Sequence, residues 1–113
     1  MELKSSKYFV DVILPLALPK TYTYEINQSE AVIIKPGFRV AVQFGKQKIY
    51  TAIVKKVHSK YPKSYEPKPI TMIMDKYPLV TKIQLKFWEW ISNYYMCSEG
   101  EVLRSSLPSA LLI

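Results

Sequence analysis

The sequence predicts a mainly β fold: a small, partly open β-barrel of the OB-like kind, followed by an amphipathic helix and a short second helix. Short segments between residues 8 and 75 alternate apolar and polar side chains, as strands do. Turns, rather than helices, separate these segments, which favours a barrel over a βαβ sheet. From Thr81 the apolar spacing becomes helical. With 113 residues, we expect one domain spanning 1–113, with a β part at about 8–75 and a helical part at about 81–107.

Five segments carry the strand pattern. They are bounded by prolines, glycines and polar clusters, which interrupt a β-ladder or turn the chain. A tight turn at 35–38 combines a proline with Gly37, and a second turn at 45–48 joins two of the segments into a hairpin. The predicted strands are residues 8–14, 21–26, 39–44, 49–57 and 69–74.

The helical part begins at a capping box. Thr81 and Gln84 have the spacing at which an N-cap hydroxyl and a side chain three residues later cap a helix reciprocally. A helix of about four turns follows. A second capping box at 98–101 starts a short helix that Pro108 ends.

One face of the long helix is expected to pack on the core. Its apolar residues recur at helical spacing, and aromatic side chains on such a face are usually part of the core. We therefore predict that Trp90 is buried and that Trp88 lies in the core or at a domain contact. The predicted core-facing residues are Ile83, Phe87, Trp90, Ile91 and Tyr94.

The composition excludes several kinds of function. Cys97 and His58 are the single cysteine and the single histidine, so a disulfide framework and a Cys-based zinc site cannot be assembled. Catalysis by a Cys–His pair or a Ser–His–Asp triad is not expected. A phosphate-binding GxxxxGK[ST] loop is also absent from the sequence. We predict neither a catalytic nor a metal site. The apolar runs are too short to span a membrane, and together with the cysteine usage they predict a soluble, cytoplasmic protein.

Positive charge is concentrated in the middle third of the chain. Residues 35–68 hold nine basic side chains and one acid, Glu66, whereas the rest of the chain is nearly balanced. Clustered positive charge is typical of a surface that binds phosphates, although lysine-rich surfaces that are merely solvated are common. The nine are Lys35, Arg39, Lys46, Lys48, Lys55, Lys56, Lys60, Lys63 and Lys68.

Four stretches, in order, carry a resemblance to a known family. They read VDVILPLALPKTYTYEI, VIIKPGFRVAVQFGKQK, PITMIMDKYPLVTKIQLKFWEWISNYYMCSEGEVL and LRSSLP. The most specific pieces are the PGxRVxVxFG turn and strand, and the aromatic helix that runs into YYxxxxGEVLRxxLP. The chain resembles, over nearly all of residues 8–113, the N-terminal 3′-end DNA-binding domain of the PriA family of replication-restart helicases (primosomal protein N′).

The resemblance implies a pocket for the 3′-terminal nucleotide of a leading strand at a stalled fork. Members of the family use an aromatic–Asp–aromatic triplet, the glycine of the xFG turn and a lysine before the last strand. In this chain the triplet is Tyr22, Thr23 and Tyr24, the glycine is Gly45 and the lysine is Lys68. Thr23 departs from the family pattern, because a hydroxyl replaces a carboxylate that can accept hydrogen bonds but not donate them.

The basic hairpin adds expected phosphate contacts, and the family adds expected partners. The hairpin contacts are Arg39, Lys46 and Lys48. The resemblance further implies an N-terminal fragment of a larger ATP-dependent DNA helicase. No cofactor is expected in this domain, because ATP and zinc would be bound by the rest of such a protein. Expected partners are forked or single-stranded DNA with a free 3′ end, the remaining helicase domains in cis, other primosome proteins and single-strand-binding protein, but no membrane.

Two alternatives remain open on the sequence alone. A general barrel that binds single-stranded DNA or RNA would show the same basic hairpin. A protein-interaction module would use the long helix and the apolar C-terminus to pack on neighbouring domains. The salt dependence of nucleic-acid binding and the effect of a blocked 3′ end separate these functions.

Overall fold

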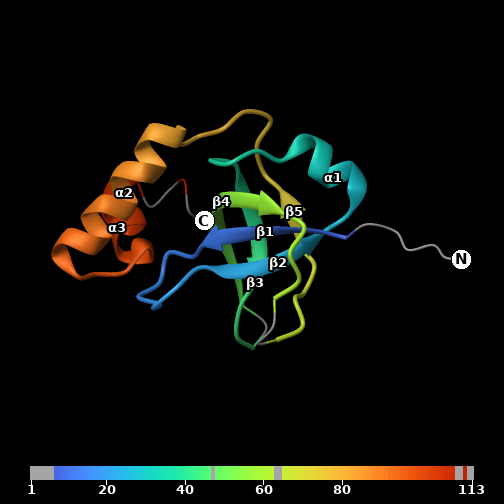
Figure 1. Cartoon of the computed structure of the whole chain (residues 1–113), viewed down its shortest axis with the longest axis horizontal. Helices are drawn as coiled ribbons and strands as arrows, with labels where there is room; N and C mark the ends of the chain where they lie inside the picture. Colours follow the sequence, from blue (N-terminus) through green and yellow to red (C-terminus); the bar gives the residue numbers. More distant parts are fainter. Residues whose placement is uncertain (1–6, 47, 63–64, 109–110, 112–113) are drawn as a thin grey trace, which may run out of the picture.

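The computed structural model describes residues 7–46, 48–62, 65–108 and 111. Its strands form one antiparallel sheet in the order β2-β1-β4-β3-β5, which curls into a half-barrel (Figure 1). The strands are β1 (Tyr8–Ile13), β2 (Tyr22–Ile26), β3 (Arg39–Gln43), β4 (Ile49–His58) and β5 (Met72–Ile73).

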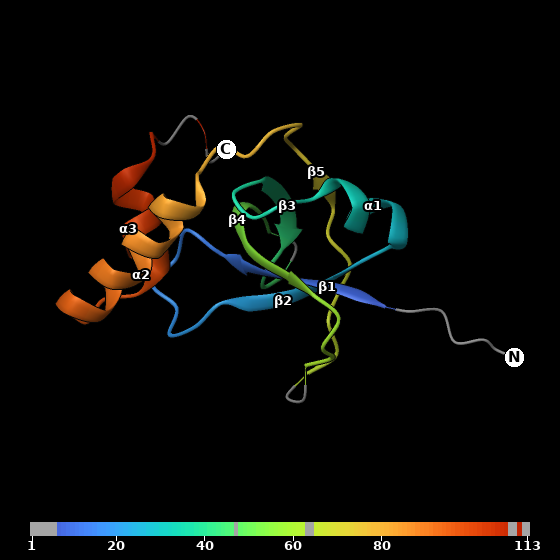
Figure 2. The same ribbon diagram turned by 45° about the horizontal axis from the view of Figure 1, so that its top comes forward.

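Three helices lie on two sides of the half-barrel. Helices α2 (Lys82–Tyr95) and α3 (Glu99–Ser106) follow the strands, pack on each other and cover one side. The short α1 (Gln28–Ile33), which was not predicted, lies toward the opposite end (Figure 2). The mainly β fold with two C-terminal helices is as predicted. Among the described residues, no helix has the length and apolar character that crossing a bilayer requires.

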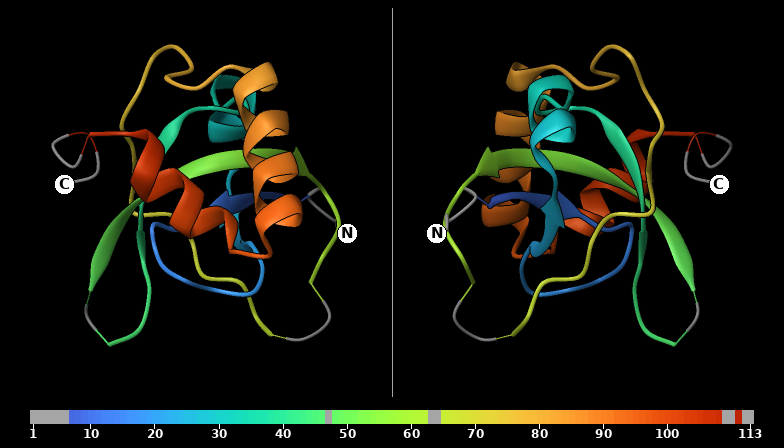
Figure 3. Two further views of the ribbon diagram at one scale, coloured as in Figure 1. Left: turned by 90° about the vertical axis from the view of Figure 1, so that its left-hand side faces the viewer. Right: turned by 90° about the vertical axis from the view of Figure 1, so that its right-hand side faces the viewer.

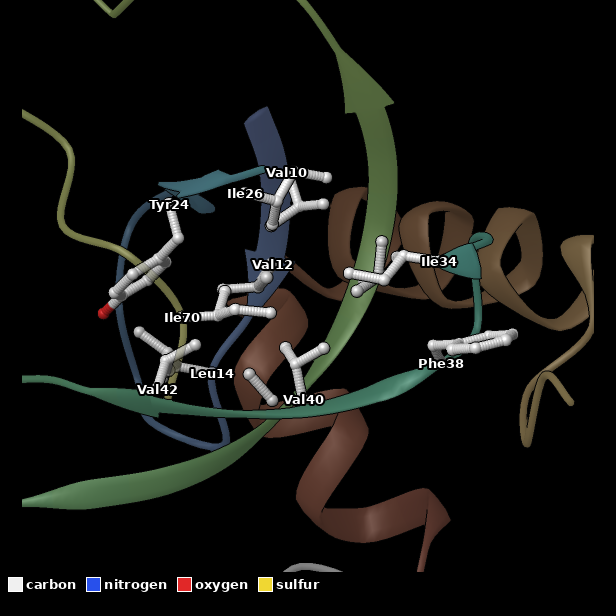
Figure 4. Packing of buried hydrophobic residues seen from close by; sticks show 12 residues of the cluster. Val10, Val12, Leu14, Tyr24, Ile26, Ile34, Phe38, Val40, Val42 and Ile70 are labelled. Carbon is white, nitrogen blue, oxygen red and sulfur yellow. The ribbon is translucent and has the colours of Figure 1, made fainter. Parts of the chain in front are cut away.

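The interior of the half-barrel is the larger of two cores. The predicted alternation is confirmed, since Val10 and Val12 on β1 and Val40 and Val42 on β3 are all fully buried and face inward (Figure 4). Complete burial of a valine contributes roughly 1.5–3 kcal/mol relative to exposure. These inward rows hold the strands in one register, because a slip of one residue would turn them outward.

The connection between β4 and β5 bonds first to β2, at one edge of the sheet, and then to β3. The Glu25 amide on β2 donates to the Lys68 carbonyl at 2.8 Å, and the Thr71 amide donates to the Ala41 carbonyl on β3 at 2.7 Å. The last strand is shorter than the predicted 69–74, because Lys68 and Ile70 bond to Glu25 on β2 and the chain joins β3 only from Thr71. This arrangement holds β2 to the part of the sheet that β3 and β5 form.

The second core lies between the outer face of the sheet and helices α2 and α3. Ile13 and Ile53 on the sheet pack with Leu85 and Trp88 on α2, and with Leu103 on α3. Figure 3 (left) shows the two helices crossing on this side of the barrel. Both predicted capping boxes are present, so each helix begins where the sequence placed it.

The predicted orientation of α2 is wrong. Trp88 is buried, with 3% of its surface exposed, whereas Trp90 is 55% exposed. The predicted core row, apart from the half-buried Ile91, faces outward. The helix carries apolar side chains on two faces, and packing against the sheet and α3 selects the face of Leu85 and Trp88.

A charged cluster fastens the helices to the sheet. The register between β1 and β4 shifts beside Lys55, which marks a bulge, and bulges re-aim side chains. The Lys55 ammonium lies 2.8 Å from Glu99 and 3.5 Å from Glu89. Burial by itself would lower the pKa of Lys55, but the hydrogen bonds and charges of the two carboxylates outweigh it, so the pKa is raised.

Candidate nucleic-acid interface

The structure brings the five predicted end-binding residues together. They line one pocket of about 260 Å³ at the end of the barrel where β3 turns into β4. Tyr22, Thr23 and Tyr24 come from β2, Gly45 comes from the turn, and Lys68 comes from the connection before β5. Gln43, Phe44, Tyr65 and Glu66 complete the lining.

The walls of this pocket are largely aromatic. Tyr22 is half-buried and lies edge-on to Phe44, with ring centroids 5.0 Å apart and planes at 71°. The ring centroid of Tyr65 lies 6.2 Å from that of Tyr22. A rigid wall of rings is the kind of surface on which any base can stack without its sequence being read.

Tyr24 is part of the wall and of the core at the same time. Its side chain is 5% exposed, and its hydroxyl donates to the Gln43 carbonyl at 2.7 Å (Figure 4). Burial, with smaller contributions from Tyr65 and Tyr22, raises its pKa to about 12. Tyr24 therefore stays neutral and fixed, and its bond to β3 helps to shape the pocket.

Thr23 is bonded to a carboxylate on the neighbouring strand. Its hydroxyl donates to Asp11 Oδ1 at 2.7 Å, and the two residues are direct partners in the ladder between β1 and β2. His58 Nε2 lies 2.8 Å from the same oxygen. The Thr23 amide donates to the Tyr65 hydroxyl at 2.8 Å, which positions that ring at the pocket. An acidic group thus lies next to the triplet but is supplied by β1.

Gly45 leaves the backbone of the turn open. Its φ of +74° is in the region that favours glycine, and a Cβ there would meet nothing within 4 Å. A ligand can therefore approach this peptide closely. Lys46 and Lys48 flank it and are exposed, as is Lys68 across the pocket. Of these three cations Lys68 lines the pocket, where Glu66 also supplies a carboxylate, and Lys46 and Lys48 belong to the turn that carries Gly45.

Arg39 lies away from this pocket, at the opposite end of β3. Its guanidinium forms an ion pair with Asp75 at 2.8 Å and donates to the Leu111 carbonyl at 3.1 Å. The hydrogen bond to Asp75 raises the pKa of Arg39 above its ordinary value. Of the three predicted hairpin contacts, Lys46 and Lys48 lie in the turn that carries Gly45, whereas Arg39 holds the start of β3 to the segment after β5.

Sequence reasoning missed four lining residues. Phe44 could have been found, since it adjoins Gly45 in the xFG turn. Tyr65 and Glu66 lie in an aperiodic connection whose path is set by long-range bonds, so no local signal marks them. In the part of the chain that the structure describes, no group of three His, Cys, Asp or Glu side chains is arranged to hold a metal.

Comparison with known proteins gives consistent matches. A family model described as the PriA 3′DNA-binding domain (3′BD) matches residues 11–108. Replication restart protein PriA of Haemophilus influenzae is 35% identical over 103 residues, which cover 90% of this chain and 14% of that protein. Its namesake in Treponema pallidum is 23% identical over 105 residues, which cover 89% of this chain and 16% of that protein. The chain thus spans about one seventh of the length of these relatives, and it belongs to the family of PriA 3′ DNA-binding domains.

Proposed function

We propose that the pocket binds the free 3′ terminus of a nascent leading strand at a stalled replication fork, without regard to sequence, and so directs a replication-restart helicase. One observation carries the proposal: Tyr22, Thr23, Tyr24, Gly45 and Lys68, selected by family resemblance, line a single pocket.

The terminal base stacks on the ring wall. Tyr22 is the half-exposed ring of the triplet and is braced by Phe44 and Tyr65. Stacking on an aromatic ring contributes about 1–3 kcal/mol per base and tolerates every base. This suits a protein that acts wherever a fork has stalled.

The phosphates beyond the terminal sugar lie against the cations at the rim. Lys46, Lys48 and Lys68 are exposed and mobile enough to follow a backbone. Phosphate contacts position a strand but carry no sequence information. The terminal hydroxyl lies within the pocket, where Glu66 disfavours a phosphate in its place.

The larger assembly is also part of the proposal. We infer that the domain acts in cis with helicase domains that bind ATP and zinc, that it needs no cofactor itself, and that it functions in the cytoplasm with primosome proteins and single-strand-binding protein. The name of the two relatives, replication restart protein, supports this setting.

Competition between oligonucleotides with free and 3′-phosphorylated ends tests the proposal. The free end should bind more tightly to the wild type, and Tyr22→Ala should cost about 1–3 kcal/mol of binding free energy. Tyr77→Ala is the matched control, because Tyr77 is 80% exposed and does not line the pocket. Equal affinity for the two ends would contradict the proposal and leave a general single-strand binder.

A further inference from the structure

A second basic surface lies at the opposite end of β3 from the 3′-end pocket. Two adjoining hollows, of about 250 and 420 Å³, share Pro36 and Lys82 and run between the turn before β3 and the start of α2. Their lining includes Lys35, Lys55, Lys82 and Lys86 and one acid, Glu89.

Three of these lysines form no ion pair with any residue that the structure describes. Lys35, Lys82 and Lys86 are exposed and have no such partner. Lys55 is shared by two carboxylates, Glu99 at 2.8 Å and Glu89 at 3.5 Å, so these three residues together keep one negative charge. The four lysines and the two carboxylates leave the groove with a net charge of +2.

An exposed aromatic row borders the lysines on α2. Ile83, Phe87, Trp90 and Tyr94 are 80%, 55%, 55% and 65% exposed and recur at spacings of four, three and four residues. Phe87 and Trp90 lie nearly parallel at 10°, as do Trp90 and Tyr94 at 11°. On a helix with 3.6 residues per turn, the row of Lys82 and Lys86 is adjacent to this row.

We propose that this face, defined as Lys35, Lys82, Lys86, Phe87 and Trp90, binds a stretch of single-stranded nucleic acid. A basic groove beside exposed rings provides both interactions that such a strand uses: charge for its phosphates and apolar ring surface for its bases. A duplex satisfies the first interaction but keeps its bases stacked on each other, so the aromatic row favours the single strand.

This strand-binding face is separate from the 3′-end pocket. Pro36 and Gly45 lie beyond opposite ends of β3, and the five residues of this strand alone span about 17 Å. A strand that occupies both surfaces must therefore be longer than one held in the pocket alone. Single OB-type folds cover strands of about 4–16 nucleotides, so strand length distinguishes one surface from two.

The experiment measures the affinity of the 113-residue chain for oligothymidylates of about 4 and about 16 nucleotides, the limits of that range. Both carry a 3′ phosphate, so that recognition of a free end contributes nothing. The test variant is Lys35→Ala/Lys82→Ala/Lys86→Ala. The control variant is Lys7→Ala/Lys56→Ala/Lys60→Ala, which removes equal charge from lysines that line neither the groove nor the pocket.

The test variant should bind the longer strand at least tenfold more weakly at low salt, with the slope of log K against log salt reduced by about 2, since each lost phosphate contact contributes about 0.7. The control variant should retain the wild-type slope. Trp90→Ala should weaken binding of the longer strand by about 5- to 150-fold, the equivalent of one lost stacking interaction, and lower the melting temperature by no more than a few degrees.

Equal slopes and affinities for the test and control variants would overturn the proposal. A second outcome would also overturn it: the wild type binds a polyglutamate peptide, and the test variant loses this binding but still binds the oligonucleotide. The face would then be a site for an acidic protein. The wild-type preference for a free 3′ end is measured separately, so failure of end recognition and failure of this second surface give different results.

Discussion

The half-barrel and helix α2 expose their aromatic side chains in opposite ways. In the barrel, Tyr22 and Tyr24 are half-buried or buried, and a ligand would meet them inside a concave pocket. On α2, Phe87, Trp90 and Tyr94 stand on a convex face with more than half of each side chain exposed. The pocket rings are therefore part of the fold as well as of the proposed binding site, whereas these three exposed α2 rings can be removed with little effect on the fold.

The largest expected effect separates the two tryptophans of α2. Trp88→Ala should lower the free energy of unfolding by about 3–5 kcal/mol, because it opens a cavity between the sheet and α3. Trp90→Ala should lower it by less than about 1 kcal/mol, since its ring is mostly in solvent. Denaturant unfolding of both variants measures the difference, and a larger loss for Trp90→Ala would reverse the assigned orientation of the helix.

A smaller difference in stability is expected between alanine substitutions in two glycine turns. A Cβ on Gly37, which has φ +98°, would lie 1.9 Å from the Val80 carbonyl oxygen at the entry to α2. Gly37→Ala should therefore lower the free energy of unfolding by about 3 kcal/mol, from backbone strain and overlap together. At Gly45 an alanine would strain the backbone but would overlap no other atom. Gly45→Ala should therefore lower the free energy of unfolding by about 1–2 kcal/mol. Similar losses for the two variants, measured by thermal unfolding, would show that the backbone at Val80 shifts at little cost to accommodate the added methyl group.

The smallest effect concerns the departure from the family triplet. Thr23→Asp would place a carboxylate directly opposite Asp11 and remove the hydrogen bond between them. Like charges at opposed strand positions cost roughly 0.2–1 kcal/mol, so the free energy of unfolding at pH 7 should fall by that amount. Asp11→Asn/Thr23→Asp should recover the loss. Thr23→Asp that is as stable as the wild type would contradict the expected repulsion between these two opposed side chains.

The strands were predictable from sequence because a period of two leaves few alternatives. Val10, Val12, Val40 and Val42 can face inward in one register only, and local residues establish it. Which face of α2 packs on the sheet was not predictable in this way. Both faces of this helix carry large apolar residues, and contacts with Ile13, Ile53 and Leu103, distant along the chain, decide which face is buried.

The residues of the candidate site show the same difference between local and long-range determinants. Tyr22, Tyr24 and Gly45 lie on strands and a turn with clear local signals, and family resemblance identified them correctly as neighbours. Tyr65 became part of the pocket through a hydrogen bond to the Thr23 amide, 42 residues away in sequence. Side chains positioned by such long-range bonds have no local pattern that sequence reasoning can detect.

The connection that bonds to β2 has a further consequence, for self-association. Strand β2 is at the edge of the sheet, and its Thr23 and Glu25 amides are occupied by Tyr65 and Lys68. Unoccupied edge groups are templates for pairing with another chain, which leads to aggregation. Cleavage of the connection after β4 would release this edge together with an exposed row of strand amides. The segment that shapes the pocket thus also keeps neighbouring copies of the molecule from joining their sheets.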